Sequence, residues 1–453
     1  MSNLREEKFD TVVIGGGASG MMAGILASAD GAKVAILEKN SALGKKLLLT
    51  GNGRCNITQA NFSNREFVEK IGKNGKFLFS GLAIFGTHET QDFFEKLGLK
   101  LKTEKDGRVF PESDKAQDVL DALKKSLKKN GVVVKLNQNV LDFELKDGKI
   151  ICVKTIERKI YAKNFILATG GKSFPTTGST GDGYMWLEKM GHTIVRPMPA
   201  LTPIKIKERW VKELPGVSLP NVGIKILQQD KKIFAVTGEI LFTHFGLSGP
   251  AIINASKYVS QNLSACEIFL ELDLFPTLTL FALEEKLKID FENYKKKDLK
   301  NYLAEYFSQK LALIILELSK LETDRKIYSL GKTHRNNLAK LLKNIRLSVD
   351  SLLDFESAMI TSGGVSLKEV ENKTMRSKII SNLYLAGEIL DLDGPTGGYN
   401  LQIAWTTGYV AGKSSARAID KIKKEAYTSL QVPISLQLEE SSNFFAKPLV
   451  EQI

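Results

Sequence analysis

Cysteine is scarce in this sequence, and the three cysteines form no recognisable pattern. Cys55, Cys152 and Cys266 lie far apart and make no CxxC pair. This spacing argues against a disulfide framework, a zinc site and a dithiol redox centre. Any redox chemistry must therefore come from a bound cofactor, and we expect no metal.

Long apolar runs are also lacking. The first residues, MSNLREEKFD, are polar and lead directly into the first predicted strand, without the apolar core of a secretory signal or a run of membrane-spanning length. With 453 residues, of which 43% are hydrophobic and 25% charged, the composition is typical of a soluble globular protein with two or three domains. We expect a cytoplasmic protein without membrane contact.

Acidic residues are outnumbered by basic ones. The 64 Lys and Arg residues exceed the 51 Asp and Glu residues and give a formal charge of +13. This excess favours a polyanionic partner such as RNA, although many enzymes are simply basic. Between Phe281 and Arg346, fifteen Lys and Arg residues accompany nine Asp and Glu residues. In this basic segment Lys295, Lys296 and Lys297 are candidates for RNA contacts, and a solvated face is the alternative.

A nucleotide-binding unit is the clearest motif that is present. Residues Phe9 to Lys39 show an apolar strand, a glycine turn, a helix rich in Ala, Met and Leu, and a second apolar strand. Gly15, Gly17 and Gly20 match GxGxxG directly after the first strand, and Glu38 ends the second. These positions permit a tight turn, close approach of a pyrophosphate, and a carboxylate on the ribose.

The sheet pattern is interrupted and later resumes. FILATGG (165–171) is a further strand that ends beside a ligand, after which short alternating strands and then helical stretches follow. We therefore predict a discontinuous α/β, Rossmann-like domain of residues 1–190 and 356–426. An inserted domain spans 191–355, with the basic helical part at about 280–350, and 427–453 form a tail.

The distance between the nucleotide-binding parts favours FAD over NAD. A nicotinamide domain is complete within roughly 150 residues, whereas here a second glycine turn closes the sheet far later in the chain. Glu388 ends a strand, and Gly397 to Asn400 open a helix whose N–H groups can face an anionic flavin edge. There is no second GxGxxG, so NAD(P)H would bind transiently as electron donor.

Five motifs occur in order: KKLLLTGNGRCNIT, GRVFPESDKAQDVL, GEILFTHFGLSGPAI, ITSGGVSLKEVENKTMRSK and YLAGEILDLDGPTGGYNLQIAWTTGYVAG. Together they resemble the aminoacetone-oxidase-like family of FAD-binding oxidoreductases, which have the glutathione-reductase structural type. The resemblance runs from about Phe9 to about Ala418. It implies a discontinuous FAD domain interrupted by a β-barrel-like domain with a helical insertion.

The resemblance also implies which residues hold the cofactor. Gly15, Gly17, Gly20 and Glu38 would hold the ADP half, and the TGNGRCNIT stretch would line the flavin side. The full set of expected cofactor contacts comprises Gly15, Gly17, Ala18, Ser19, Gly20, Glu38, Lys39, Lys46, Thr50, Gly51, Gly53, Arg54, Cys55, Asn56, Val140, Thr169, Gly170, Gly171, Gly387, Glu388, Asp391, Gly397, Gly398, Tyr399 and Asn400.

Two residues are candidates for acid–base catalysis. Cys55 could protonate a substrate carbon, which needs a protonated thiol, or could be a small packed residue beside the cofactor. His244, in FTHFGLSGP, could act as acid or base, or could simply be a hydrogen-bonded histidine at a turn.

The favoured hypothesis is an FAD-dependent oxidoreductase that takes hydride from NAD(P)H and reduces an activated C=C bond. Activities attributed within the resembled family include dihydrouridine formation in ribosomal RNA, and the basic segment would suit that substrate. Amine oxidation of aminoacetone and reduction of small steroid-like enones are alternatives. A hypothesis of another class is an RNA- or ribosome-associated protein in which FAD is structural or redox-sensing.

Overall fold

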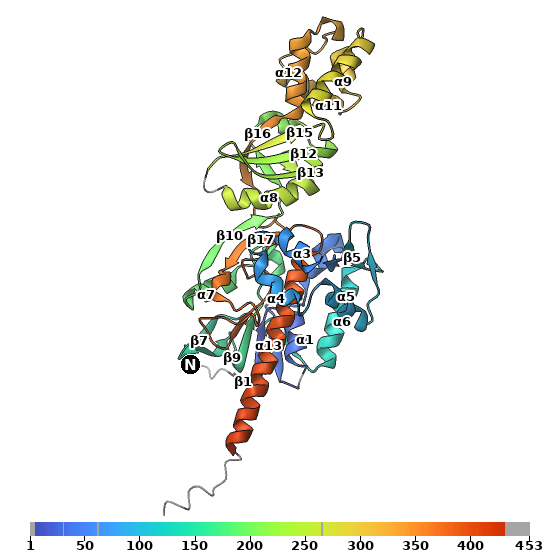
Figure 1. Ribbon diagram of the computed structural model, residues 1–453. Coiled ribbons are helices and arrows are strands. Elements are labelled where there is room, and N and C mark those ends of the chain that lie inside the picture. Colours follow the sequence, from blue (N-terminus) through green and yellow to red (C-terminus); the bar gives the residue numbers. More distant parts are fainter. Residues whose placement is uncertain (1–4, 30, 61–62, 264–265, 431–453) are drawn as a thin grey trace, which may run out of the picture.

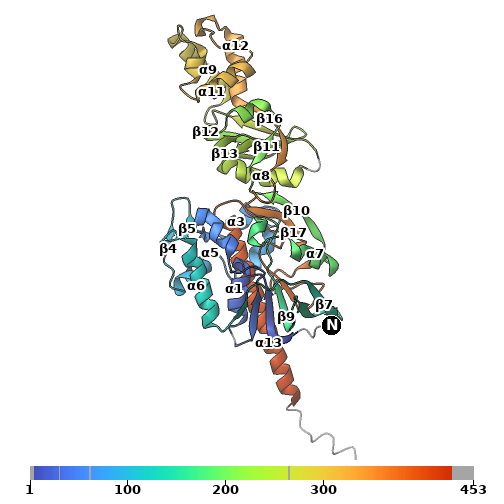
Figure 2. The same ribbon diagram turned by 180° about the vertical axis from the view of Figure 1, so that it is seen from behind.

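The computed structural model describes residues 5–29, 31–60, 63–263 and 266–430, with side chains described up to residue 422. Three parts follow one another along its length: an α/β domain, a β-barrel and a small group of helices (Figure 1). The view from behind shows the same order (Figure 2). The α/β domain and the barrel have separate hydrophobic cores.

The α/β domain is built on a seven-stranded sheet with the order β6-β2-β1-β9-β8-β7, and β18 also pairs with β9. The pairs β6–β2, β2–β1, β1–β9 and β9–β18 are parallel, while β8 joins β9 and β7 in antiparallel fashion. The strands span Arg5–Ile14 (β1), Val34–Leu37 (β2), Val133–Lys135 (β6), Asp142–Lys146 (β7), Lys149–Lys154 (β8), Arg158–Leu167 (β9) and Leu383–Leu385 (β18).

Two helices from opposite ends of the chain pack against each other beside this sheet. Helix α1 (Ala18–Ala27) follows the glycine turn, and α13 (Tyr399–Leu430) follows the second glycine-rich stretch. A Cβ at Gly408 would lie 2.5 Å from the carbonyl oxygen of Ser19, so glycine allows the two backbones to approach this closely.

The remaining elements of this domain surround the sheet. Its helices are α2 (Lys45–Leu49), α3 (Asn64–Ile71), α4 (Phe79–Leu82), α5 (Thr87–Lys96), α6 (Ala116–Lys129) and α7 (Asp182–Lys189). A small sheet has the order β3-β5-β4, with β3 at Thr58–Gln59, β5 at Arg108–Pro111 and β4 at Leu101–Thr103.

A closed barrel interrupts the α/β domain. Its strand order is β11-β14-β13-β12-β15-β16, and the antiparallel pair β10–β17 connects it to the α/β domain. Helix α8 (Pro250–Asn262) lies between the barrel and the α/β domain (Figures 1 and 2). The barrel strands are Ile204–Ile206 (β11), Ser218–Gln228 (β12), Lys231–Thr243 (β13), Gly246–Ser248 (β14), Ile268–Asp273 (β15) and Ile345–Leu352 (β16). The connecting strands are Ile194–Ala200 (β10) and Ile360–Val365 (β17).

Four helices form the far end of the molecule, between β15 and β16. They are α9 (Leu280–Asn293), α10 (Leu299–Leu303), α11 (Gln309–Leu318) and α12 (Lys332–Lys343). They occupy residues 280–343 of the segment of about 280–350 for which the sequence predicts basic helices, and the end of that segment belongs to strand β16.

The predicted fold class is confirmed: the chain is α/β, with a discontinuous Rossmann-like domain, an inserted barrel and a helical insertion. The predicted domain boundaries at 190 and 355 fall close to β10 and β17 and stay predictions. Helix α13 continues to Leu430, into the expected tail, whose residues 431–453 lie outside the described residues. Within the described ranges, no helix combines the length and hydropathy that a membrane span needs.

One carboxylate links three strands of the main sheet. Glu7 of β1 pairs with Lys135 at the end of β6 at 2.8 Å, and with Arg158 at the start of β9. The hydrogen bond from Lys135 is the main cause of a lowered pKa of the Glu7 carboxyl; Arg158 acts in the same direction and burial opposes both.

We predict that Glu7→Gln lowers the free energy of unfolding by about 1 kcal/mol at neutral pH. Because the folded-state pKa of Glu7 is lowered, its stabilisation is present above the ordinary glutamate pKa of about 4.3 and is lost as pH falls through the folded-state value. Urea unfolding at pH near 7 and near 3.5 should therefore show the two proteins converging at acid pH. An equal difference at both pH values would contradict the role of the charge.

Candidate active site at the carboxyl ends of the parallel strands

A cavity lies where strands β1, β2 and β9 end. Its wall includes the residues that directly follow Ile14, Leu37 and Leu167, and it encloses about 1300 Å³, including open solvent at the mouth. In open α/β sheets, ligands bind at this edge because the glycine turns and helix N-termini gather there.

The glycines of the first turn have different tasks. A Cβ at Gly20 would lie 1.9 Å from the carbonyl oxygen of Gly15, and one at Gly15 would lie 2.4 Å from that of Ala168. These two glycines allow the turn to pack. A Cβ at Gly17, in contrast, would meet no atom within 4 Å. Gly17 is the N-cap of α1, so the open space beside it lies where helical N–H groups can bind an anion.

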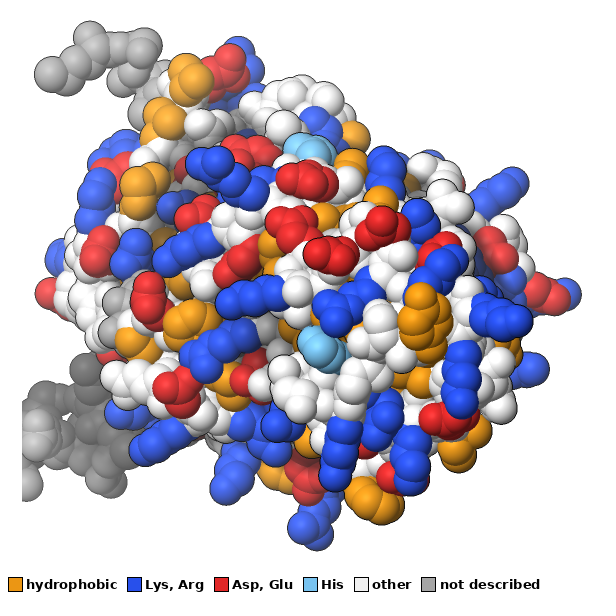
Figure 3. All heavy atoms as spheres, turned by 90° about the horizontal axis from the view of Figure 1, so that it is seen from above, with side chains coloured by type: hydrophobic (Ala, Val, Ile, Leu, Met, Phe, Trp, Pro, Cys, Tyr) orange, Lys and Arg blue, Asp and Glu red, His pale blue; other side chains and the backbone are white. Residues whose placement is uncertain are grey.

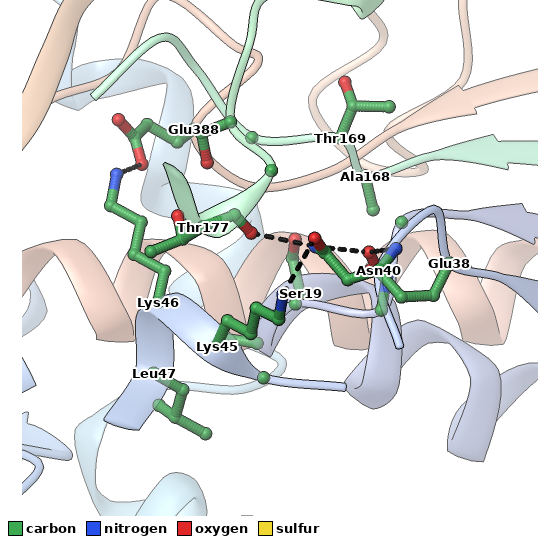
Figure 4. Close-up of a pocket in the computed structure, with 18 of the residues that line it drawn as sticks. Ser19, Glu38, Asn40, Lys45, Lys46, Leu47, Ala168, Thr169, Thr177 and Glu388 are labelled. Atoms are coloured by element: carbon green, nitrogen blue, oxygen red, sulfur yellow. Dashed lines mark hydrogen bonds and ion pairs between the residues drawn. The ribbon is translucent and has the colours of Figure 1, made fainter. Parts of the chain in front are cut away.

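Glu38 is fixed at the end of β2, as Figure 4 shows. Its Oε2 accepts from the Gly16 backbone N–H at 2.7 Å, and its Oε1 accepts from the backbone N–H and the side-chain amide of Asn40 at 2.8 and 2.7 Å. A carboxylate has about four acceptor positions. One therefore remains for a ligand hydroxyl, in a side chain that is largely buried.

The opposite wall of the cavity carries an ion pair. Lys46 Nζ lies 2.7 Å from Glu388 Oε2, and the Thr361 backbone N–H donates to Glu388 Oε1 at 2.8 Å. The Thr169 hydroxyl is buried without a hydrogen-bond partner. Its oxygen packs against Gly183, where an added Cβ would lie 2.3 Å from it, so this hydroxyl is enclosed by protein.

The TGNGRCNIT stretch reaches the cavity only through Thr50. Cys55 is 0% exposed within the hydrophobic core, and burial raises the pKa of its thiol to about 12. Arg54 pairs with Glu104 and Asp114 at 2.7 and 2.6 Å, away from the cavity wall. The stretch is thus a turn with Gly51, Asn52 and Gly53 exposed and Cys55 buried, and the geometry favours the packing alternative for Cys55 over the proton-donor alternative.

Asn56 links that turn to the second glycine-rich stretch. With its amide oriented to satisfy both atoms, it donates to the carbonyls of Val109 and Thr58 and accepts from the Gly398 backbone N–H at 3.0 Å. A Cβ at Gly398 would lie 2.5 Å from the Thr58 carbonyl. These contacts hold the second glycine-rich stretch directly against Thr58 of β3.

The expected cofactor contacts therefore fall into two groups. Those on the cavity wall are Gly15, Gly17, Ala18, Ser19, Glu38, Lys39, Lys46, Thr50, Val140, Thr169, Gly170, Glu388 and Asn400. Those outside the wall are Gly20, Gly51, Gly53, Arg54, Cys55, Asn56, Gly171, Gly387, Asp391, Gly397, Gly398 and Tyr399.

His244 and the three lysines lie away from this cavity. His244 is exposed in the turn between β13 and β14, with its ring edge-on to Phe245. Its role as acid or base stays a prediction. Lys295 pairs with Glu292 at 2.7 Å and Lys297 pairs with Glu305, both in the helical insertion. The end-on view shows acidic and basic side chains mixed over this face, with basic side chains in the majority (Figure 3).

Sequence reasoning missed one wall of the cavity, the loop Thr177 to Asp182. Lys39 Nζ pairs with Asp182 at 2.7 Å, and the Asn40 amide donates to the Thr177 carbonyl at 2.9 Å. Gly178 and Gly181, both with positive φ, were the available signal in the sequence. Among the described residues, no three His, Cys, Asp or Glu side chains are grouped as metal ligands.

Comparison with known proteins agrees with this geometry. Residues 9–414 match the family described as HI0933-like protein Rossmann domain. The chain is 33% identical to the 3-dehydro-bile acid delta(4,6)-reductase of Clostridium scindens, over 89% of this chain and 98% of that protein. It is 29% identical to the ribosomal RNA dihydrouridine synthase of Escherichia coli, over 90% of this chain and 100% of that protein.

Solved structures share the fold at low sequence identity. A flavocytochrome c3 fumarate reductase aligns with a TM-score of 0.50 and 18% identity, over 91% of this chain and 79% of its own. The 3-ketosteroid delta1-dehydrogenase of Sterolibacterium denitrificans aligns with a TM-score of 0.50 and 13% identity, over 91% and 100%. The narrower aminoacetone-oxidase label stays a prediction. The chain belongs to the HI0933-like Rossmann-domain family and is an FAD-dependent flavoprotein oxidoreductase.

Proposed function

We propose that this oxidoreductase reduces a carbon–carbon double bond conjugated to a carbonyl group. NAD(P)H is the proposed electron donor, and uridine in ribosomal RNA is the favoured substrate. The supporting observation is that the names of two full-length relatives describe this kind of bond: the delta(4,6) double bonds of a 3-dehydro bile acid, and the double bond that uridine loses in dihydrouridine.

The residues of the cavity fit FAD. The empty space at Gly17 and the α1 N-terminus suit a pyrophosphate, and the remaining acceptor position of Glu38 suits a ribose hydroxyl. The side chain of Glu388 offers a polar contact on the opposite wall. Bound FAD supplies two-electron hydride chemistry at this place.

The protein has three further tasks in such a reaction. Apolar wall residues, among them Leu392, Leu401 and Ile403, keep water from the cavity. The N-terminus of α13, at Asn400, offers N–H groups toward developing negative charge. A general acid must also protonate the substrate carbon. Cys55 keeps its proton at neutral pH but does not line the cavity.

The net positive charge of the protein supports RNA as the substrate, but this support is weaker where basic side chains are paired with acidic ones. The formal charge of +13 favours a phosphate backbone. Of the three candidate lysines, however, Lys295 and Lys297 have acidic partners, so part of the local positive field is cancelled. The second candidate substrate is a small conjugated enone, favoured by the relative at 33% identity.

We predict that Gly17→Val yields a folded but colourless protein, because a side chain at this position extends into the space of the pyrophosphate and its Cβ meets no protein atom within 4 Å. Gly331→Val is the matched control. Both glycines are helix N-caps in extended conformation, with φ of −80° and −76°, and a Cβ at Gly331 meets only His334 at 4.0 Å.

FAD absorbance per protein after desalting, together with circular dichroism, measures the outcome. Folded Gly17→Val protein that keeps its FAD would contradict the placement of the pyrophosphate. Loss of FAD from Gly331→Val as well would mean that a valine at a helix N-cap causes FAD loss by disturbing the fold.

For Cys55→Ala we expect substrate turnover within a few-fold of wild type, because the thiol lies in the core. The free energy of unfolding should fall by about 1 kcal/mol, the usual cost of a small void. Stopped-flow measurement of the reductive and oxidative half-reactions separates the alternatives. A decrease of roughly 10²- to 10⁴-fold in the rate of substrate reduction, with an unchanged rate of flavin reduction, would instead identify Cys55 as the general acid.

The substrate proposal predicts that the protein, reduced anaerobically by NADPH or NADH, is reoxidised by ribosomal RNA lacking its own dihydrouridine. Mass spectrometry should then find one uridine heavier by two hydrogen atoms. Replacing Lys295, Lys296 and Lys297 by Ala should weaken this reaction and leave oxidation by a small enone unchanged.

Other outcomes point to the alternatives. Reoxidation by a conjugated steroid enone and not by RNA would favour the small-molecule reductase. Bleaching by an amine would indicate an amine oxidase. FAD that neither nicotinamide nor amine reduces would favour an RNA-associated protein with structural or redox-sensing FAD.

A further inference from the structure

Helix α8 carries a buried charge toward the α/β domain. Figures 1 and 2 place this helix between the barrel and that domain. Lys257, in its second half, is only 8% exposed. An ammonium group is costly to bury unless it is paired and hydrogen-bonded. The partners of Lys257 therefore show what α8 is fixed to.

All of these partners belong to the α/β domain. Lys257 Nζ donates to the carbonyl of Ile71 at 2.9 Å and to that of Asp393 at 2.6 Å, and it lies 3.3 Å from the Asp393 carboxylate. Ile71 ends α3, and Asp393 lies between β18 and α13. Because two partners are main-chain carbonyls, Lys257 fixes the position of the backbone itself.

A second side chain of α8 holds the same segment one turn earlier. Asn254 Oδ1 accepts from the backbone N–H and the hydroxyl of Thr396 at 2.9 and 3.1 Å. Between these two attachment points, the Gly394 backbone N–H donates to Asn400 Oδ1 at 2.8 Å, and Asn400 Nδ2 donates to the Gly394 carbonyl at 2.9 Å. The segment from 393 to 396 is thus held by the barrel on one side and by Asn400 on the other.

This segment continues directly into the cofactor cavity. Leu392, adjacent to Asp393, lines the wall, and so do Glu388 before it and Asn400 after it. A displacement of Asp393 would therefore move wall residues on both sides. We infer that Lys257 is a positioning residue: from the barrel it sets the geometry of the FAD cavity wall, so that FAD retention depends on the docking of the barrel.

The inference rests on FAD binding in this cavity and on no particular substrate. A purely structural ion pair is the competing explanation. Burial raises the pKa of the Asp393 carboxyl, with Asp391 acting in the same direction and Lys257 opposing both. Loss of Lys257 would therefore leave an uncompensated buried carboxylate and lower stability in either case.

The chain contains a matched control. Lys343 Nζ also donates to two main-chain carbonyls, those of Phe275 and Leu278, at 3.0 and 2.5 Å, and it pairs with Asp273 at 2.6 Å. All of these residues lie in the barrel and its helical insertion, and none lines the cavity. Lys343→Met removes a similar set of contacts without touching the cavity wall.

The experiment compares Lys257→Met and Lys343→Met as FAD-loaded, full-length proteins. Both should unfold at lower temperature than wild type. Lys257→Met alone should release FAD roughly 5- to 150-fold faster, the usual size of a coupling between two sites. The visible circular dichroism of its bound flavin should also change. FAD release at the Lys343→Met rate, with an unchanged flavin spectrum, would overturn the inference.

Two further variants separate positioning from stability. Lys257→Met/Asp393→Asn removes the uncompensated charge and should regain thermal stability without regaining slow FAD release; recovery of both would show an ion pair that acts on stability alone. Should neither lysine variant fold, Asn254→Ala carries the test, because it removes only the Thr396 contacts. It should speed FAD release, and an unchanged rate would overturn the inference. A wild-type protein that holds no FAD would instead overturn the cofactor assignment.

Discussion

The close approach of three backbones around the first glycine turn is the constraint on which the rest of the structure depends. The backbone N–H of Gly15 donates to the Leu37 carbonyl and that of Ala168 donates to the Ile14 carbonyl, both at 2.8 Å, so the ends of β1, β2 and β9 meet at one point. Gly20 and Gly408 remove the side chains that would keep α1 and α13 away from this point. Segments from both ends of the chain can therefore share one cavity.

Two opposite walls of the cavity each carry one carboxylate, Glu38 and Glu388. On the β2 side, backbone and amide donors hold the Glu38 carboxylate in place. On the other side, Glu388 is held by Lys46 and by the backbone of Thr361. Each carboxylate thus has a fixed orientation, which lets it bind a ligand without losing side-chain freedom at that moment. The barrel adds a third element, because α8 holds the backbone between Glu388 and Asn400.

The electrostatic field of the helical insertion depends on how its charged side chains are paired, and not only on the net charge. The helical insertion has a clear excess of Lys and Arg in sequence, yet Lys286, Lys295 and Lys297 each have an acidic partner nearby. Paired surface charges contribute little to stability, and their field weakens quickly with distance in salt. A basic segment in sequence is therefore a weaker argument for RNA than an unpaired basic surface would be.

The sequence alone determined the α/β class, the βαβ unit with Gly15, Gly17, Gly20 and Glu38, and the interruption by a second domain. These features follow from local hydrophobic periodicity and from glycine positions that a nearby turn requires. Only the tertiary structure decided that Cys55 is buried in the core, that the loop Thr177 to Asp182 forms a wall of the cavity, and that Lys257 donates a hydrogen bond to the Asp393 carbonyl. Burial and pairing depend on contacts between segments far apart in the chain, and local sequence patterns carry no information about those distances.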